Sequence, residues 1–297
     1  MPYLNRLNRY TWMGLSSILI WASLVAVVKL ITESLSPILA IALIYSFSAL
    51  SILLLNGFPQ MSRMPKSYLW GCGSLFVLYE VLFLSSVAFS HDHEQVLMIG
   101  MINYLWPPLT VVFAIFAKQL SYKLPVILGF ILAVLGLMMV VNPDVLNLSK
   151  LFSVLQKNPV AYSFALIGAI LWSCYSVLTK KYAQGHNAVP LFFTVTAVSL
   201  WVVHFVSAEP FSFPNFKMWA AIALTGSLIG IAYSHWNQSL QFGDMKLLIL
   251  VTYFMPILSS VMSMLILDAT PQLAFWIGTI LVTIGAIVCW KSTAERQ

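Results

Sequence analysis

The feature that most constrains this chain is a succession of apolar runs, each about as long as a lipid bilayer is thick. Of the 297 residues, 60% are hydrophobic and only 8% are charged, whereas an average soluble chain carries about 25% charged residues. A helix needs about 20 apolar residues to cross the hydrocarbon core. Ten such runs lie near 12–32, 37–55, 67–90, 95–118, 123–142, 160–183, 188–207, 216–242, 245–268 and 272–291. The sequence therefore predicts an all-α membrane protein with ten transmembrane helices.

The distribution of basic residues predicts which way these helices run. Cytoplasmic loops of membrane proteins carry an excess of Lys and Arg. If the chain begins in the cytoplasm, that side holds Arg6, Arg9, Arg63, Lys66, Lys118, Lys123, Lys180, Lys181, Lys246, Lys291 and Arg296, and the other side holds Lys29, Lys150, Lys157 and Lys217. We therefore expect both termini in the cytoplasm. This bias also accounts for the net charge of +6, so the charge does not indicate a nucleic-acid partner.

Motifs for metal binding or enzyme chemistry are weak in this sequence. Cys72, Cys174 and Cys289 lie in apolar runs, and their spacing matches neither a metal site nor a disulfide framework. The segment "HDHE", residues 91–94, has two His and two acids, but it lacks helical ligand spacing and a distant third ligand. H-E-x-x-H, G-x-S-x-G and nucleotide-binding loops do not occur. We expect no cofactor, no metal and no enzyme activity.

The sequence also resembles itself at a period near 150 residues. The matched pairs are Trp21 with Trp172 and Lys29 with Lys180 at a shift of 151, and Tyr104 with Tyr253, Pro107 with Pro256, Gly129 with Gly278 and Gly136 with Gly285 at a shift of 149. Because each half holds five runs, an odd number, the second half must enter the membrane from the opposite side. We therefore predict two inverted repeats, residues 1–145 and 146–297. Secondary transporters with this architecture place their substrate site near the midplane, between the repeats.

Two of the matched runs carry prolines near their middle, in "NYLWPPL" (103–109) and "TYFMPIL" (252–258). Proline removes a backbone donor, so the carbonyl four residues earlier loses its helical partner. Lipid cannot replace that partner, and irregular backbone survives at membrane depth only against protein or a wet cavity. Kinks made for helix packing are the alternative explanation, since proline is common in membrane helices. Paired interruptions in two repeats favour a binding cavity.

The candidate substrate site collects polar, aromatic and proline residues predicted at membrane depth. They are Trp21, Tyr79, Glu80, Asn103, Tyr104, Trp106, Pro107, Trp172, Tyr175, Tyr233, Trp236, Asn237, Tyr253 and Pro256. Such an aromatic stripe can also be simple packing, but Trp and Tyr away from the membrane interfaces need polar partners. Glu80 is the acid that falls in the middle of a run. It can recognise a substrate amine, handle a proton, or bond to a neighbouring helix as a neutral carboxyl group.

Several segments together resemble the drug/metabolite transporter superfamily in its ten-span form, which is built from two EamA-type repeats. The segments are "IYSFSAL", "GFPQM", "LFVLYE", "GMINYLWPPLTVVFAI", "TKKYAQG", "SLWV" and "YFMPILSS", and "GMINYLWP" is the most specific. Within the superfamily, the chain is most similar to the aromatic amino acid exporters of enteric bacteria. The resemblance implies ten helices around a central cavity that passes amino acids out of the cytoplasm.

The resemblance thus implies a bacterial inner-membrane transporter that exports aromatic and other neutral amino acids by alternating access. Export of cationic drugs is a second hypothesis, in which Glu80 and the aromatic walls would hold the cation. An intramembrane enzyme would need a nucleophile with its base, or metal ligands on facing helices. A structural scaffold would not explain polar residues at matching depths of two repeats. The expected partners are a small-molecule substrate and the bilayer, and a monomer suffices.

The predicted orientation can be tested by labelling single cysteines in intact cells with a membrane-impermeant thiol reagent. A cysteine introduced beside Arg63 should stay unlabelled until the cells are opened, because that loop is expected in the cytoplasm. A cysteine beside Asp144 should react from outside. Labelling of the first site in intact cells would show that the orientation is reversed.

Overall fold

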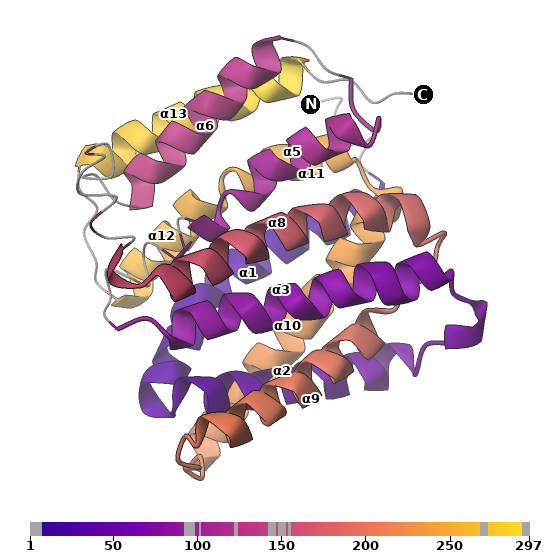
Figure 1. Cartoon of the computed structure of the whole chain (residues 1–297), viewed down its shortest axis with the longest axis vertical. Helices are drawn as coiled ribbons and strands as arrows, with labels where there is room; N and C mark the ends of the chain where they lie inside the picture. The colour runs from indigo at the N-terminus through magenta and orange to yellow at the C-terminus, as the bar shows by residue number, and fades with distance from the viewer. Residues whose placement is uncertain are drawn as a thin grey trace. The chain divides into compact units, whose positions relative to one another are not determined.

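The computed structural model describes residues 8–91, 99–100, 102–121, 124–141, 147, 153, 156–267 and 273–292, and every regular element among them is helical (Figure 1). The α-helices are α1 (Arg9–Ser34), α2 (Pro37–Asn56), α3 (Gly73–Ala88), α5 (Trp106–Phe116), α6 (Pro125–Val141), α8 (Pro159–Tyr182), α9 (Val189–Ser207), α10 (Phe216–Phe242), α11 (Met245–Thr252), α12 (Met255–Leu267) and α13 (Leu273–Ser292). Two short helices of other types, η2 (Met61–Arg63) and η3 (Ser67–Cys72), precede α3.

These helices coincide with the apolar runs of the sequence. The run predicted at 216–242 is α10, and the run predicted at 160–183 is α8, with ends that differ by one residue. Five described helical segments are long and apolar enough to cross a membrane: Pro37–Asn56, Ser67–Val87, Pro159–Tyr182, Val189–Ser207 and Phe216–Phe242. Shorter apolar helices occupy further predicted runs. The prediction of an all-α membrane fold is therefore confirmed.

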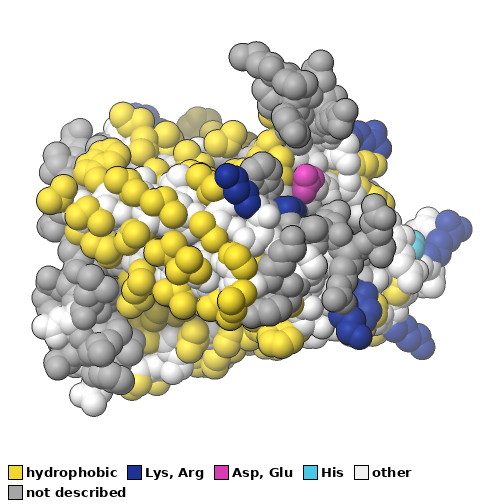
Figure 2. All heavy atoms as spheres, turned by 90° about the horizontal axis from the view of Figure 1, so that it is seen from above, with side chains coloured by type: hydrophobic (Ala, Val, Ile, Leu, Met, Phe, Trp, Pro, Cys, Tyr) yellow, Lys and Arg dark blue, Asp and Glu magenta, His cyan; other side chains and the backbone are white. Residues whose placement is uncertain are grey.

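The outer faces of the helices carry exposed apolar side chains, as lipid-facing helices do. On α13, Ile277, Ile280, Ile284 and Ile287 follow one another at spacings of three and four residues, which places them on one face. Their side chains are 42–58% exposed. On the face seen in Figure 2, hydrophobic side chains cover a broad area, and Lys and Arg side chains gather towards the right of the view. A surface of this kind is suited to hydrocarbon rather than water.

The chain divides into two compact units. Unit 1 comprises Met1–Leu84 and Leu178–Asp244, and unit 2 comprises Ser85–Val177 and Met245–Gln297. Each unit therefore combines segments from both halves of the sequence. The compact units are not the same segments as the predicted repeats 1–145 and 146–297, which stay a prediction based on the internal similarity.

In unit 1, α10 packs against both α1 and α2, and α2 also packs against α9. The α2–α10 contact is close because Gly226 on α10 has no side chain. A Cβ atom at Gly226 would lie 2.4 Å from the carbonyl oxygen of Ile44. The Ser48 hydroxyl group donates to the carbonyl oxygen of Gly226 at 2.7 Å. Small residues and short polar links of this kind replace the hydrophobic effect as the cause of helix association in lipid.

In unit 2, α6 and α13 lie side by side (Figure 1) and touch at two pairs of glycines. A Cβ atom at Gly129 would lie 2.8 Å from the carbonyl oxygen of Gly285, and one at Gly136 would lie 2.6 Å from that of Gly278. The helices are antiparallel, since the residue numbers rise on α6 as they fall on α13. Because Gly129 matches Gly278 and Gly136 matches Gly285 in the internal repeat, the two contacts are equivalent.

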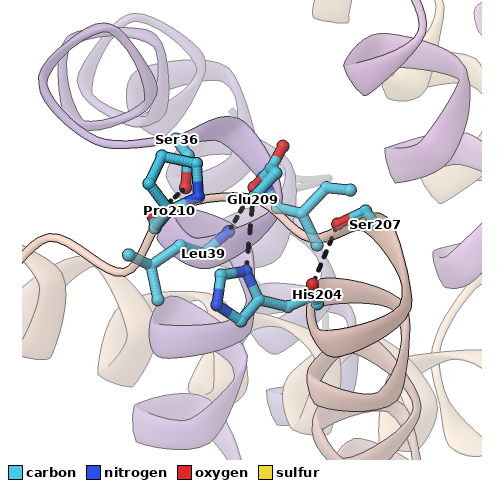
Figure 3. A network of polar contacts seen from close by, with 7 residues as sticks. Ser36, Leu39, His204, Ser207, Glu209 and Pro210 are labelled. Atoms are coloured by element: carbon cyan, nitrogen blue, oxygen red, sulfur yellow. Dashed lines mark hydrogen bonds and ion pairs between the residues drawn. The ribbon is translucent and has the colours of Figure 1, made fainter.

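A carboxylate clasp in unit 1 ties the start of α2 to the segment after α9 (Figure 3). One carboxylate oxygen of Glu209 accepts the backbone N–H groups of Ile38 at 3.1 Å and Leu39 at 3.3 Å. Ser36, which precedes α2, makes no capping bond with its side chain. Glu209 thus supplies the negative charge and the acceptor that a helix N-terminus needs. His204, buried on α9, lies 3.8 Å from the same oxygen.

Gly285→Ala should lower the unfolding free energy of the protein in detergent by about 1–3 kcal/mol, the usual cost of overpacking a tight contact. The added methyl group would lie 2.6 Å from both the Gly129 carbonyl oxygen and the Ala133 nitrogen, so α6 and α13 must separate. Gly71→Ala is the matched control, because a Cβ atom there has no neighbour within 4 Å. Equal stability of the two variants would rule out the glycine contact as a determinant of this helix pair.

Glu209→Ala should lower the unfolding free energy by about 0.5–2 kcal/mol, the range found for lost helix caps. Two N–H groups of α2 would then lose their acceptor. Lys217→Ala, at an exposed position in the same unit, serves as the control. If thermal unfolding in detergent gives Glu209→Ala the same midpoint as the unaltered protein, water replaces the carboxylate as acceptor and the clasp does not stabilise the protein.

Candidate functional site

Both predicted helix interruptions are present, and they lie at corresponding positions of the sequence repeat. Non-helical turns at 104–105 and 253–254 separate two helical segments in each case. Around these turns, the N–H groups of Leu105 and Phe254 bond to carbonyl oxygens three residues back, at 3.1 and 3.0 Å. The shift of 149 residues found in the sequence is therefore reproduced in the backbone. Pro107 and Pro256 follow these turns, each as the second residue of the next helix, α5 or α12.

Side-chain hydroxyl groups take up backbone acceptors at the first interruption. The carbonyl oxygen of Trp106 accepts from Ser173 on α8 at 2.9 Å and from Thr110 at 2.7 Å. Pro107 has no N–H group, so the carbonyl group of Asn103 lacks the partner that a continuous helix would give it. The side-chain oxygen Oδ1 of Asn103 is buried and has no hydrogen-bond partner among the described residues. The interruption thus presents acceptors that a ligand can use.

An aromatic cluster of unit 2 lies next to this interruption. The rings of Trp106 and Trp172 meet edge to face at 6.2 Å, and Trp172 stacks on Tyr175 at 5.0 Å. All three side chains are buried. The structure thus brings together three predicted site residues from α5 and α8. Such rings offer a flat apolar wall whose contacts exceed simple area burial by about 0.5–1.5 kcal/mol per aromatic pair.

The second interruption is packed differently. Tyr253 is fully buried in the apolar core of unit 2, together with Ile249, Val282 and Cys289. No ring contact joins it to Trp106, Trp172 or Tyr175 in the part of the chain that the structure describes. Tyr104 connects the two interrupted regions, because its hydroxyl group lies 3.0 Å from that of Ser259 on α12.

Glu80 is a buried carboxyl group in unit 1, with 1% of its surface exposed. The hydroxyl group of Tyr45, on α2, donates to its Oε2 atom at 2.5 Å. The hydroxyl group of Tyr233, on α10, is its other polar neighbour. Atom Oε1 has no hydrogen-bond partner of good geometry among the described residues. None of the described Lys, Arg and His residues forms an ion pair with Glu80.

Aromatic rings pack around the two tyrosines that adjoin this carboxyl group, and we call the set the Glu80 cluster: Trp21, Tyr45, Phe76, Glu80, Phe193, Tyr233 and Trp236. Phe193 lies 5.3 Å from Tyr45 and 5.2 Å from Tyr233, measured between ring centroids. Trp21 lies 4.8 Å from Tyr233 and 5.4 Å from Trp236. Tyr45, Phe76 and Phe193 were not among the predicted site residues, although Tyr45 lies in the segment "IYSFSAL" and Phe76 in "LFVLYE".

The predicted residue Asn237 belongs to a separate polar network in unit 1. Its Oδ1 atom accepts from the hydroxyl group of Tyr68 at 2.9 Å, and its Nδ2 group donates to Asn187 at 3.2 Å. Tyr68 in turn accepts the backbone N–H of Ala188 at 3.1 Å, just before α9. Asn237 is fully buried. In this arrangement its side chain holds the start of α9 in place, and no sequence pattern had indicated Tyr68 or Asn187 as its partners.

The predicted site residues thus divide between the two units. Unit 1 holds Trp21, Tyr79, Glu80, Tyr233, Trp236 and Asn237, and unit 2 holds Asn103, Tyr104, Trp106, Pro107, Trp172, Tyr175, Tyr253 and Pro256. Tyr79 stacks on Phe83 at 5.8 Å. That the two groups face one central cavity stays a prediction. Of the segment "HDHE", only His91 is described, and the other three residues lie outside the described part. Among the described residues, no group of three or more His, Cys, Asp and Glu could hold a metal ion.

Helices of membrane-spanning length, paired helix interruptions and a buried carboxyl group are the features of a membrane transporter. Residues 159–290 match the sequence model of the EamA-like transporter family. This match and the 34% identity to a relative over almost its whole length show that the chain belongs to the EamA-like transporter family.

Three relatives share a name that states what they transport. The "Aromatic amino acid exporter YddG" of Escherichia coli K12 is 34% identical over 290 residues, which are 96% of this chain and 98% of the relative. The protein of the same name from Salmonella typhimurium 14028s is 33% identical and covers 97% and 99%. That of Ancylobacter novellus is 25% identical and covers 94% and 96%. One solved crystal structure is 26% identical, with a TM-score of 0.75, and covers 94% of this chain and 96% of its own.

Proposed function

We propose that this chain exports aromatic and other neutral amino acids from the bacterial cytoplasm by alternating access. The observation that carries the proposal is the 34% identity, over 96% of the chain, to an exporter of aromatic amino acids. The similarity extends over 96% of this chain and 98% of the exporter, so it is not confined to one half of the sequence. The geometry agrees with it, because buried rings and acceptors without partners are what an aromatic amino acid needs.

The architecture we propose is ten transmembrane helices in two inverted five-helix repeats, in the inner membrane, with both termini cytoplasmic. Two observations support the inverted repeat. The helix interruptions recur at a shift of 149 residues, and the Gly129–Gly285 and Gly136–Gly278 contacts are equivalent under the same shift. Transporters with inverted repeats bind substrate at interrupted helices near the midplane.

In the proposed site, different groups recognise the ring and the amino acid moiety. Trp106, Trp172 and Tyr175 would contact the substrate ring. Asn103 and the carbonyl groups freed by the prolines would supply polar contacts to the amino acid moiety, because a buried charge without polar partners is costly. An exporter must also release its cargo, so many weak contacts suit it better than one strong contact.

Export of aromatic cations is the second candidate function, and one observation favours it. Glu80 is a buried acid whose tyrosine neighbours, Tyr45 and Tyr233, pack against further aromatic rings, and an acid beside such rings can hold an organic cation through charge and cation–π contacts. The two functions are distinguished by phenethylamine, which keeps the ring and the ammonium group of phenylalanine but lacks its carboxylate group. A cation exporter would move this amine in preference to phenylalanine.

Trp106→Ala should lower phenylalanine flux more than threonine flux in vesicles that contain the purified protein. Only phenylalanine loses a ring contact, and that contact is worth about 0.5–1.5 kcal/mol, or roughly a 2- to 12-fold effect. Asn103→Leu should lower both fluxes alike, because it removes an acceptor for the amino acid moiety that both substrates share. Trp276→Ala is the control, since Trp276 is 50% exposed on α13.

Equal losses of phenylalanine and threonine flux in Trp106→Ala vesicles, at matched protein content, would contradict the ring assignment. The export function itself is tested by the unaltered protein in the same assay. If vesicles with the protein move phenylalanine no faster than empty vesicles, the proposed function is wrong.

A further inference from the structure

One carboxyl oxygen of Glu80 accepts a hydrogen bond, and the other has no hydrogen-bond partner of good geometry. Tyr45 donates to Oε2, while Oε1 is buried and has no hydrogen bond of good geometry from the described residues, although the Tyr233 hydroxyl group is a polar neighbour of the carboxyl group. A buried carboxyl group needs a proton, a cation or further donors to offset the loss of water. No described cation pairs with it. Oε1 is therefore a position for a proton or for an N–H donor that comes with a ligand.

We propose that Glu80 couples export to proton entry by binding, in turn, a proton and the substrate's ammonium group. This inference rests on the proposed export function. The two occupants exclude each other because both need Oε1, the oxygen that Tyr45 leaves open. Acidic residues inside membrane helices commonly act in proton pathways, and here the geometry gives the acid a second, competing occupant.

Among the described residues, the titratable groups around Glu80 are tyrosines. The titratable groups that face it are Tyr45 from α2 and Tyr233 from α10, and Tyr79 adjoins both on its own helix. Phe193 on α9 contacts Tyr45 and Tyr233, and Trp21 on α1 contacts Tyr233. Neither Phe193 nor Trp21 has a side chain that titrates. His235 on α10 pairs with Ser16 at 3.0 Å. Glu80 is therefore the carboxylic acid of the Glu80 cluster, and we assign the transported proton to it.

The proposed cycle balances protons and charge. With its site open to the cytoplasm, the ionised Glu80 accepts an N–H bond from the ammonium group of a zwitterionic amino acid. After the site opens outwards, a proton from outside binds Oε1 and the amino acid leaves. The protonated carrier returns and releases the proton into the cytoplasm. One neutral amino acid leaves and one proton enters, so each cycle moves one positive charge inwards.

The test uses the full-length protein in lipid vesicles, with labelled phenylalanine outside and an interior one pH unit more acidic. Potassium and valinomycin hold the membrane potential at zero. One-for-one exchange should accumulate phenylalanine inside about tenfold, since one pH unit equals a tenfold proton gradient. A protonophore should abolish the accumulation. Without potassium and valinomycin, phenylalanine uptake should generate a voltage, negative inside, because each proton carries positive charge outwards.

Variants of Glu80 and of a control carboxylate show which group carries the proton that drives phenylalanine accumulation. Glu80→Gln cannot carry a proton, so it should lose the accumulation, and it should exchange labelled for unlabelled phenylalanine at equal pH more slowly than the unaltered protein because the partner of the ammonium group has lost its charge. Glu80→Asp keeps the carboxyl group and should retain part of the accumulation. Glu209→Gln, which changes the carboxylate of the clasp instead, should accumulate phenylalanine as the unaltered protein does.

Two results would overturn the coupling. One is undiminished accumulation by Glu80→Gln. The other is an unaltered protein that exchanges phenylalanine at equal pH but neither accumulates it under the gradient nor moves charge. In that second case the export function stands and only the coupling fails, whereas absence of any exchange would refute the export function itself. The charge measurement uses the unaltered protein, so it decides the question even if the Glu80 variants do not fold.

Discussion

The structure depends on one constraint: backbone polar groups at membrane depth must find their partners within the protein, because lipid offers none. Regular helices meet this constraint by themselves, and the apolar runs form them. The constraint also makes an interruption informative. At 104–105 and 253–254 the helical pattern stops, and hydroxyl groups such as Ser173 and Thr110 take up a nearby carbonyl oxygen. The breaks recur at two repeat-related positions, which indicates a built site rather than a packing defect.

The two polar regions of unit 1 differ in whether their buried polar atoms have partners. Around Asn237 the amide group has partners on both sides, in Tyr68 and Asn187, so the network holds helices in place. Around Glu80 one oxygen remains without a partner. Asn103 in unit 2 likewise has an acceptor without a partner. Since an unsatisfied buried polar group costs about 1–3 kcal/mol, atoms of this kind are where a transported ligand gains most by binding.

The positions of the helices and of their interruptions could be predicted from the sequence, because hydropathy and proline determine the structure of the segment in which they occur. The run predicted at 216–242 is α10 to the residue, and the prolines located both interruptions. The partners of polar residues were not predictable, since they are distant in sequence. Tyr45 meets Glu80 across 35 residues, and Glu209 caps α2 across 171. A lone tyrosine in an apolar run gives no signal of what it faces. For that reason the sequence predicted Glu80 as a site residue but not its donor Tyr45. It likewise predicted Asn237 but not its partners Tyr68 and Asn187.

The central claim is that the interrupted segment at 103–109 faces the path of the substrate. Its most direct test is the rate at which a small, water-soluble maleimide labels Asn103→Cys in a chain without other cysteines, with and without phenylalanine. Saturating phenylalanine should slow the labelling of this site and leave that of Gly71→Cys, at an exposed position, unchanged. Equal labelling of Asn103→Cys with and without phenylalanine, in protein that still transports phenylalanine, would contradict the claim.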